Sequence, residues 1–260
     1  MPQEENALLW SRGLHYGDGV YRTMAVRRGK ILYFLPQLKK LSQDARRLQI
    51  TPLPVPDVAR ACEKAISPKE DAVLKIIVTR GGSRRGYRPE AGARPSFFVL
   101  KSPWPERKLS PEGIKARLCR LRLCRQPALA GIKHLNRLEN VLACAEWDDP
   151  QTPEGVLLDS EGFLVGGTMS NLFLWNHGML WTPSLRFSGV RGLTRSLIAL
   201  WARKNRVPLR VGSFKLSDFF SAKGAFFCNS VSGIWPIASC EDKTFQDFEV
   251  AHALLRAIFP

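Results

Sequence analysis

Hydrophobic residues along the chain follow two spacings, and the change from one spacing to the other outlines the expected elements. Apolar residues at every third or fourth position indicate one face of a helix, whereas short apolar runs between turn residues indicate strands. In the first part of the chain these patterns predict strands at residues 31–35, 73–79 and 96–100 and helices at residues 37–48 and 57–65. Asp57 is expected to cap the second helix. We expect an α+β domain over residues 1–104, which is a usual domain size.

Prolines interrupt the pattern between residues 103 and 111, so residues 105–112 are expected to form a linker. Beyond the linker the pattern predicts strands at residues 114–123, 155–159, 163–167, 170–175 and 225–228, and helices after Lys133, at 195–205 and at 248–258. The turns between the middle strands indicate a meander. Residues 113–260 are therefore expected to form a larger α+β domain that carries Lys133.

The segment GIKHLNRLENVLACAEW, residues 131–147, combines a lysine with a helix start. Asn136 is expected to cap that helix, and Glu139, three residues later, to bond back as in a capping box. Four apolar residues then recur at helical spacing and are expected to face the core. They are Leu138, Val141, Leu142 and Ala145.

Lys133 is expected to lie just outside this helix N-terminus, where the backbone carries partial positive charge. A second positive charge is disfavoured there, so the Lys133 ammonium should lose its proton more readily than that of an exposed lysine. A neutral amine is the form that condenses with an aldehyde. For a lysine considered alone, the alternative is an ordinary solvated side chain.

Composition limits the class of protein. The chain has 260 residues, 45% of them apolar, and it contains no run of about 18 apolar residues that would predict a membrane span. Its first residues lack a signal-peptide pattern, which favours a cytoplasmic location. Its six cysteines form no CxxC pair and are accompanied by no histidine cluster, so we expect reduced thiols and no metal site.

The net charge of the chain is strongly positive, because 39 basic and 23 acidic residues give +16. A basic surface favours nucleic-acid binding through counterion release. The basic residues are scattered along the chain, however, and no nucleic-acid-binding motif accompanies them, so no nucleic-acid partner is expected. A soluble basic surface is the simpler interpretation, and a positive field would also attract an anionic substrate and cofactor.

Six segments, in the same order along the chain, resemble the fold-type IV pyridoxal-phosphate enzymes, a branched-chain aminotransferase-like family. They are RGLHYGDGVYRT (12–23), VTRGGSRRGYRP (78–89), GIKHLNRLENVLACAEW (131–147), LLDSEGFLVGGTMSNLFLW (157–175), GVRGLTRSLI (189–198) and CNSVSGIWPI (228–237). The resemblance implies a two-domain α+β fold with the active site between the domains, pyridoxal 5'-phosphate as the cofactor, a small anionic substrate and a homodimer. Within the family, the third and sixth segments look most like the 4-amino-4-deoxychorismate lyases.

The resemblance also implies roles for individual residues. Lys133 would bind the cofactor aldehyde and act as general base and then acid. Lys40 falls where the family usually has an arginine that reaches the cofactor phosphate, and lysine keeps the charge but loses the bidentate fork. The other implied cofactor contacts are Leu193, Thr194 and Ser230, and the implied substrate contacts are Arg84, Tyr87, Arg88 and Asn229.

Two positions depart from the family pattern. Gly166 stands where the family usually has the glutamate that partners the pyridine nitrogen, and Arg22 stands where it usually has the glutamate of Phe-Glu-Thr. If the ring nitrogen merely lacks its partner, Gly166→Glu should increase turnover. Three functions stay open. They are a lyase that converts 4-amino-4-deoxychorismate to 4-aminobenzoate and pyruvate for folate synthesis, a branched-chain or D-amino acid transaminase, and a non-catalytic binding protein that retains the fold.

Overall fold

The computed structural model describes residues 9–82, 85–105, 110 and 112–259, so Arg84, which is predicted to bind substrate, lies outside the described residues. The chain divides into two compact units. Unit 1 comprises Met1–Glu106 and Ile132–Asn136, and unit 2 comprises Arg107–Gly131 and Arg137–Pro260. Lys133 is thus grouped with unit 1, whereas the division expected from the sequence places it in the second domain.

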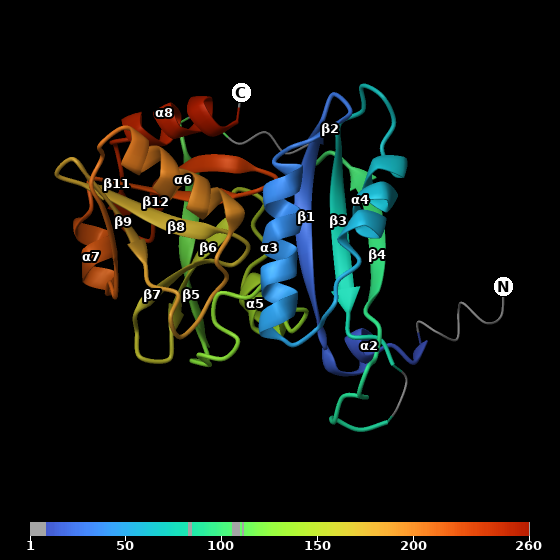
Figure 1. The fold of residues 1–260 in the computed structure, drawn as a ribbon. Coiled ribbons are helices and arrows are strands. Elements are labelled where there is room, and N and C mark those ends of the chain that lie inside the picture. The colour runs from blue at the N-terminus through green and yellow to red at the C-terminus, as the bar shows by residue number, and fades with distance from the viewer. Residues whose placement is uncertain (1–8, 83–84, 106–109, 111, 260) are drawn as a thin grey trace. The chain divides into compact units, whose positions relative to one another are not determined.

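Unit 1 contains an antiparallel sheet with the strand order β2-β1-β3-β4 (Figure 1). Its elements in chain order are α2 (Arg12–Tyr16), β1 (Gly19–Arg27), β2 (Lys30–Ile31), α3 (Phe34–Arg47), α4 (Val55–Lys64), β3 (Ala72–Thr79) and β4 (Ser96–Pro103). Because side chains alternate between the two faces of a strand, every second residue of β1 and β3 packs with α3 and α4 in one core. That core includes Val20, Met24, Val26, Leu38, Leu41, Val58, Cys62, Leu74, Ile76 and Val78.

The two helices and the two later strands predicted in this unit are confirmed, with ends shifted by a few residues. The predicted strand at residues 31–35 is wrong beyond Ile31, because Tyr33 adopts a left-handed backbone with φ of 54° and α3 begins at Phe34. Asp57 does not cap α4. Pro54 is the N-cap residue, and Asp57 lies inside the first turn.

Unit 2 is built around a nine-stranded mixed sheet with the order β10-β9-β8-β11-β12-β5-β6-β7, and β13 pairs with β12 (Figure 1). Its elements in chain order are β5 (Ile114–Leu123), α5 (Leu138–Cys144), β6 (Glu154–Asp159), β7 (Leu164–Gly167), β8 (Asn171–Asn176), β9 (Met179–Pro183), α6 (Leu193–Lys204), β10 (Leu209–Gly212), α7 (Leu216–Ser221), β11 (Gly224–Asn229), β12 (Gly233–Cys240), β13 (Lys243–Thr244) and α8 (Glu249–Ile258). Large buried side chains fill its main core, among them Phe214, Phe219, Phe227 and Trp235.

The strands predicted in this unit are confirmed, but the predicted meander is wrong. β6 pairs with β7, and β8 pairs with β9, each in antiparallel fashion. The second neighbour of β8 is β11 rather than β7. The chain therefore forms two separate hairpins, because the turn at residues 168–170 carries it away from the edge of the sheet.

Helix α5 differs from its prediction in both its cap and its face. Arg137 is the N-cap residue, whereas Nδ2 of Asn136 donates to the carbonyl oxygen of Gly17 at 3.2 Å. Glu139 accepts the backbone N–H of Cys124 at 2.7 Å, so the capping box does not form. The residues expected to face the core are exposed instead, at 75% for Leu138, 58% for Val141 and 59% for Leu142, and Ala145 is also exposed.

Two carboxylates near α5 bond to the backbone at β5. The pairing of β5 with β6 shifts register between Leu118 and Arg122. Within this interval Glu146, just beyond α5, accepts the N–H groups of Arg120 at 2.8 Å and Leu121 at 2.7 Å. Glu139 of α5 bonds in the same way just past the end of β5, whereas the apolar residues of α5 are exposed.

Candidate active site

Lys133 lies on a short extended segment, Ile132–Asn136, that pairs with the first part of β1. The N–H of Tyr21 donates to the carbonyl oxygen of Lys133 at 3.0 Å, and the N–H of Leu135 donates to that of Gly19 at 3.0 Å. Gly19 allows this close approach, because a Cβ there would lie 2.4 Å from the carbonyl oxygen of Val78 and 2.7 Å from Leu135 Cδ1. The glycine of the GDG motif thus positions the segment that carries the lysine.

The Lys133 side chain lies over an aromatic ring. Its Nζ is 4.5 Å from the ring centroid of Tyr21, and Nζ of Lys75, from β3, is 5.0 Å from the same centroid. The neighbouring His134 forms a bridge with Val20, a core residue, and successive side chains of an extended segment alternate between its two faces. The amine is therefore held on the face of the sheet that carries Tyr21.

Asp44 contacts two of the predicted site residues in unit 1, Lys133 and Lys40. Its Oδ2 accepts the backbone N–H of Lys133 at 3.1 Å and pairs with the guanidinium of Arg22, and its Oδ1 lies 3.7 Å from Nζ of Lys40. Both Arg22 and Asp44 are 2% exposed. Burial lowers the pKa of Arg22, and the charge of Asp44 opposes that change. Lys133 and Lys40, both predicted as cofactor contacts from the resemblance, are thus linked through one buried carboxylate.

Asp44 is a site residue that sequence reasoning missed. It follows Leu41 by three positions and therefore lies on the core face of a helix on which most other buried residues are apolar. An acidic residue at such a position rarely stays buried without a cation. That signal was available in the sequence, although the identity of its partners was not.

The loop that carries Tyr87 and Arg88 is anchored through its backbone. Arg12 donates to the carbonyl oxygens of Gly86 and Tyr87, each at 2.8 Å, and Tyr16 packs edge-on against Tyr87 with 5.3 Å between ring centroids. The Tyr87 side chain is nevertheless 85% exposed, and Arg88 is exposed as well. Two of the predicted substrate contacts therefore extend into solvent from a fixed loop.

Asp18 stabilises the base of this loop. It pairs with Arg12 at 2.9 Å and with Arg80 at 2.8 Å, and Arg80 also donates to the carbonyl oxygens of Leu48 and Gln49. Burial alone would raise the pKa of Asp18, but the hydrogen bonds and charges of Arg80 and Arg12 outweigh it and lower the pKa. Arg12 and Arg80 thus serve the architecture of unit 1.

In unit 2, the predicted phosphate contacts Leu193 and Thr194 lie in the first turn of α6. Leu193 and Thr194 are its first residues, no side chain among the described residues caps the helix, and its first turn contains no acidic residue. The N–H of Gly192, the N-cap residue, donates to Oδ1 of Asn171 at 3.0 Å. A helix start of this kind offers backbone N–H groups and partial positive charge to an anion.

Asn171 connects this helix start to β11, because it pairs with Cys228 in the β8–β11 ladder. Ser230 follows directly after β11, in a turn that Asn229 holds. Oδ1 of Asn229 accepts the N–H groups of Val231 at 2.9 Å and Ser232 at 2.8 Å. The side-chain oxygen of Asn229, a predicted substrate contact, is thus already hydrogen-bonded within the turn.

Gly166 lies on β7 beside a turn that a buried carboxylate holds. Glu154, which is 0% exposed, accepts the N–H of Thr168 at 2.7 Å, the hydroxyl of Thr168, and the hydroxyl of Ser170 at 2.8 Å. Burial raises the pKa of Glu154, and these hydrogen bonds oppose the rise. A Cβ at position 166 would lie 2.8 Å from the carbonyl oxygen of Ser170. The turn is therefore packed for glycine, and its carboxylate is already occupied.

These residues fit most of what pyridoxal phosphate requires of a protein. The start of α6 suits the phosphate. Lys133 offers an amine, and the N–H and carbonyl groups of its backbone are both hydrogen-bonded. The position that would face the pyridine nitrogen in the family is Gly166, which carries no acceptor group. The donor set thus fits the aldehyde and the phosphate and departs at the ring nitrogen.

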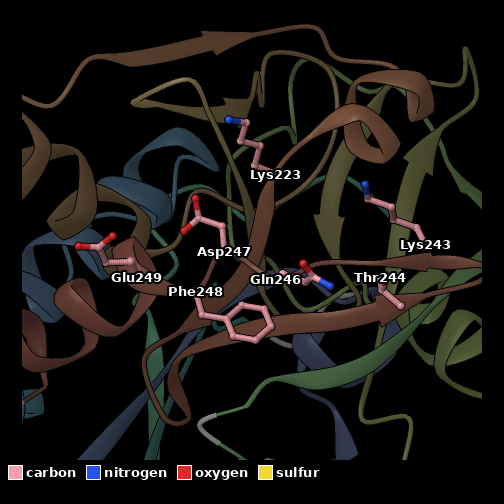
Figure 2. A pocket seen from close by; sticks show the side chains of 7 residues that line it. All are labelled: Lys223, Lys243, Thr244, Gln246, Asp247, Phe248 and Glu249. Carbon is pink, nitrogen blue, oxygen red and sulfur yellow. The ribbon is translucent and has the colours of Figure 1, made fainter.

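A cavity of about 710 Å³ elsewhere on unit 2 contains none of the predicted site residues. Figure 2 shows its lining, which mixes cationic, acidic and neutral side chains: Lys223, Lys243, Thr244, Gln246, Asp247, Phe248 and Glu249. Over the described part of the chain, no three His, Cys, Asp or Glu side chains are grouped so that they could hold a metal ion. Within the same residues, no helix has the length and apolar character needed to cross a membrane.

Comparison with known proteins extends over nearly the whole chain. An aminodeoxychorismate lyase from Vibrio harveyi is 32% identical over 235 residues, which cover 88% of this chain and 86% of that protein. A D-alanine aminotransferase from Listeria monocytogenes is 26% identical over 248 residues, which cover 91% and 83%. The crystal structure of 4-amino-4-deoxychorismate lyase from Pseudomonas aeruginosa matches with a TM-score of 0.90 and 38% identity, covering 96% of this chain and 93% of that one.

These matches confirm the α+β fold of the fold-type IV enzymes predicted from the sequence. The profile described as Amino-transferase class IV matches residues 19–240, which include both Lys133 and the start of α6. The chain therefore belongs to the class IV aminotransferase family.

Proposed function

We propose that the protein is a pyridoxal-phosphate-dependent lyase that converts 4-amino-4-deoxychorismate to 4-aminobenzoate and pyruvate. The observation that carries the proposal is the placement of Lys133, whose N–H is bound by Asp44 and whose carbonyl oxygen is bound by Tyr21. A lysine fixed in this way presents its amine in one direction. The similarity to aminodeoxychorismate lyases, at 32% and 38% identity, supports this choice of reaction.

Lys133 would act on the substrate as base and then as acid. Pyridoxal phosphate supplies an aldehyde for the amine and a ring that withdraws electrons. The Lys133 amine removes the proton from the amino-bearing ring carbon, the carbon–oxygen bond to the enolpyruvyl group breaks, and the ring becomes aromatic. The released enol takes up a proton and becomes pyruvate, so the atoms balance without a further reactant. A positioned proton-transfer group contributes about 10²- to 10⁴-fold to such a reaction.

The remaining predicted residues would hold anionic groups. Leu193 and Thr194 present backbone N–H groups at the start of α6 to the cofactor phosphate, with Ser230 as a hydroxyl donor. Arg88 and Tyr87 lie on the anchored loop and would meet the carboxylates of the substrate. The net charge of +16 favours the approach of such a substrate.

The direct test is product formation by the purified protein with added pyridoxal phosphate. With 4-amino-4-deoxychorismate we expect 4-aminobenzoate and pyruvate in equal amounts, and Lys133→Ala should lower the rate by about a thousandfold. Lys75→Ala is the matched control, because Lys75 contacts the same Tyr21 ring and should be dispensable. Loss of activity in both variants, or in neither, would contradict the role of Lys133.

A transaminase is the second candidate, favoured by the 26% identity to a D-alanine aminotransferase. Incubation with D-alanine or branched-chain amino acids and 2-oxoglutarate would then yield glutamate. Glutamate formation without 4-aminobenzoate would replace the lyase proposal. The third candidate, a non-catalytic protein, is favoured by Gly166, and protein that stays colourless with added cofactor would support it.

We also infer that the protein forms a homodimer. The support within this chain is the exposed apolar face of α5, defined by Leu138, Val141 and Leu142. Exposed contiguous apolar patches are typical of protein–protein interfaces. A second copy of the chain is the partner that the α5 face would meet.

A further inference from the structure

Asp44, the carboxylate beside the backbone of Lys133, lies on helix α3, and the buried cation that pairs with it, Arg22, lies on strand β1. Arg22 lies on the face of β1 that also carries Val20 and Met24, both core residues. A guanidinium at 2% exposure is stable only when a counter-charge is next to it. Asp44 of α3 supplies that charge.

Asp44 connects three parts of unit 1 through two oxygens. Oδ2 is shared between the guanidinium of Arg22 and the backbone N–H of Lys133, while Oδ1 lies near Nζ of Lys40. The sheet, α3 and the segment Ile132–Asn136 are therefore tied at one point. Without this contact, the lysine segment would keep its bonds to β1 and the packing of Ile132 in the core, but lose this hydrogen bond to α3.

We propose that Asp44 is the positioning residue for Lys133: it fixes the backbone of the lysine against α3. The part that Lys133 plays in catalysis rests on the proposed function, but the contact itself does not. Arg22 and Asp44 act as one ion pair, with the carboxylate on α3 and the guanidinium on β1. The pair balances the buried charge, and its shared Oδ2 also accepts the lysine N–H.

The positioning role is tested in cofactor-free protein by amide hydrogen exchange. Two double variants, Arg22→Met/Asp44→Asn and Arg22→Met/Asp44→Ala, both lack the buried ion pair, but only the first keeps an acceptor for the Lys133 N–H. We expect the Lys133 amide to exchange about tenfold faster in the alanine variant. The Tyr21 amide, bound to Lys133 oxygen, is the internal reference. Equal exchange of Lys133 in both variants would overturn the positioning role.

Asp71→Asn is the matched control, since Asp71 also pairs with an arginine of β1, Arg27, and accepts a backbone N–H, but at the other end of the strand. It should leave the exchange of the Lys133 amide unchanged. Exchange of Lys133 in Asp71→Asn as fast as in the alanine variant would also overturn the positioning role.

This readout requires neither the cofactor nor a substrate. A protein that shows the difference in exchange yet forms no 4-aminobenzoate would contradict the proposed function and leave the inference about Asp44 standing. A protein with lyase activity but without the difference in exchange would do the reverse.

Discussion

Glu154 and Thr168 form a buried pair in which one carboxylate oxygen accepts both the hydroxyl and the backbone N–H of the threonine. The second oxygen accepts from Ser170. Two strands that are adjacent in the sheet, β6 and β7, are thereby joined to the turn that leads to β8. The turn beside Gly166 is consequently fixed by a residue twelve positions earlier in the chain.

Glu154→Gln should destabilise the protein, because an amide NH₂ group would face donors that need an acceptor. We expect a loss of about 1–3 kcal/mol in the free energy of unfolding, measured by urea titration. Glu161→Gln is the control. Glu161 pairs with Arg125, but its side chain is 60% exposed, so the substitution should cost less than about 1 kcal/mol. Equal losses would mean that the buried network contributes little.

Gly166→Glu should not raise turnover, although the sequence alone suggests that it would. Its Cβ would displace the carbonyl oxygen of Ser170, at a cost of about 1–3 kcal/mol in unfolding free energy. Gly166→Ala should show the same loss, whereas Gly212→Ala, whose added Cβ makes ordinary contacts of 3.4 Å or more with Phe214, should not. Thermal unfolding and product formation by both Gly166 variants check the expectation, and a faster Gly166→Glu enzyme of normal stability would refute it.

The Asp18 ion pairs should make the free energy of unfolding decrease as the pH is lowered through the acid range. The pKa of Asp18 is lowered in the folded protein from its ordinary value of 3.8. Its contribution is therefore complete above that value and is lost as the pH falls through the folded pKa. Denaturant unfolding between pH 2 and 6 should show a shallower acid slope in Asp18→Asn. Parallel curves for the two proteins would exclude Asp18 as a source of the slope.

Thiol reactivity should separate the cysteines into two groups. Burial raises the pKa of Cys62 to about 11 and those of Cys119, Cys228 and Cys240 to about 12, so these thiols carry almost no thiolate at pH 8. Cys124 and Cys144 are exposed. A disulfide reagent should titrate these two in the native protein and the other four after unfolding. Rapid native labelling of a buried cysteine would show that its surroundings open.

The α5 face should determine the oligomeric state. We expect the protein to be a dimer by light scattering and Leu138→Ser/Val141→Ser to shift it to a monomer at micromolar concentration. Leu200→Ser, a change at an exposed leucine of α6, is the control and should stay dimeric. A monomeric unchanged protein, or a dimeric double variant, would exclude the α5 face as the interface.

The sequence predicted the segments of this fold better than the contacts that join them. Residues 131–147 contain the pattern of a capping box, yet Glu139 accepts the backbone N–H of Cys124, which lies 15 positions away along the chain. Spacing within the segment cannot predict such a partner. The same limit applies to Asp44, whose contact with Lys133 joins residues 89 positions apart.

The setting of Lys133 differs from the one expected at a helix start. The helix begins later than expected, with Arg137 as its N-cap, and the backbone of the lysine is held instead by Asp44 of α3 and Tyr21 of β1. Motif matching predicted the lysine and the start of α6, since both lie in short contiguous sequences. The contact with Asp44 depends on packing and could not be read from those motifs.

The membership of Ile132–Asn136 in unit 1 has a consequence for any attempt to divide the protein. The polypeptide passes from one unit to the other after residues 106, 131 and 136, so unit 1 is not a contiguous piece of sequence. A fragment that ended at the linker would lack the strand that covers the edge of β1, and exposed strand edges promote aggregation. The lysine segment is thus a structural part of the sheet, and the protein is expected to be produced and to fold only as an uninterrupted chain.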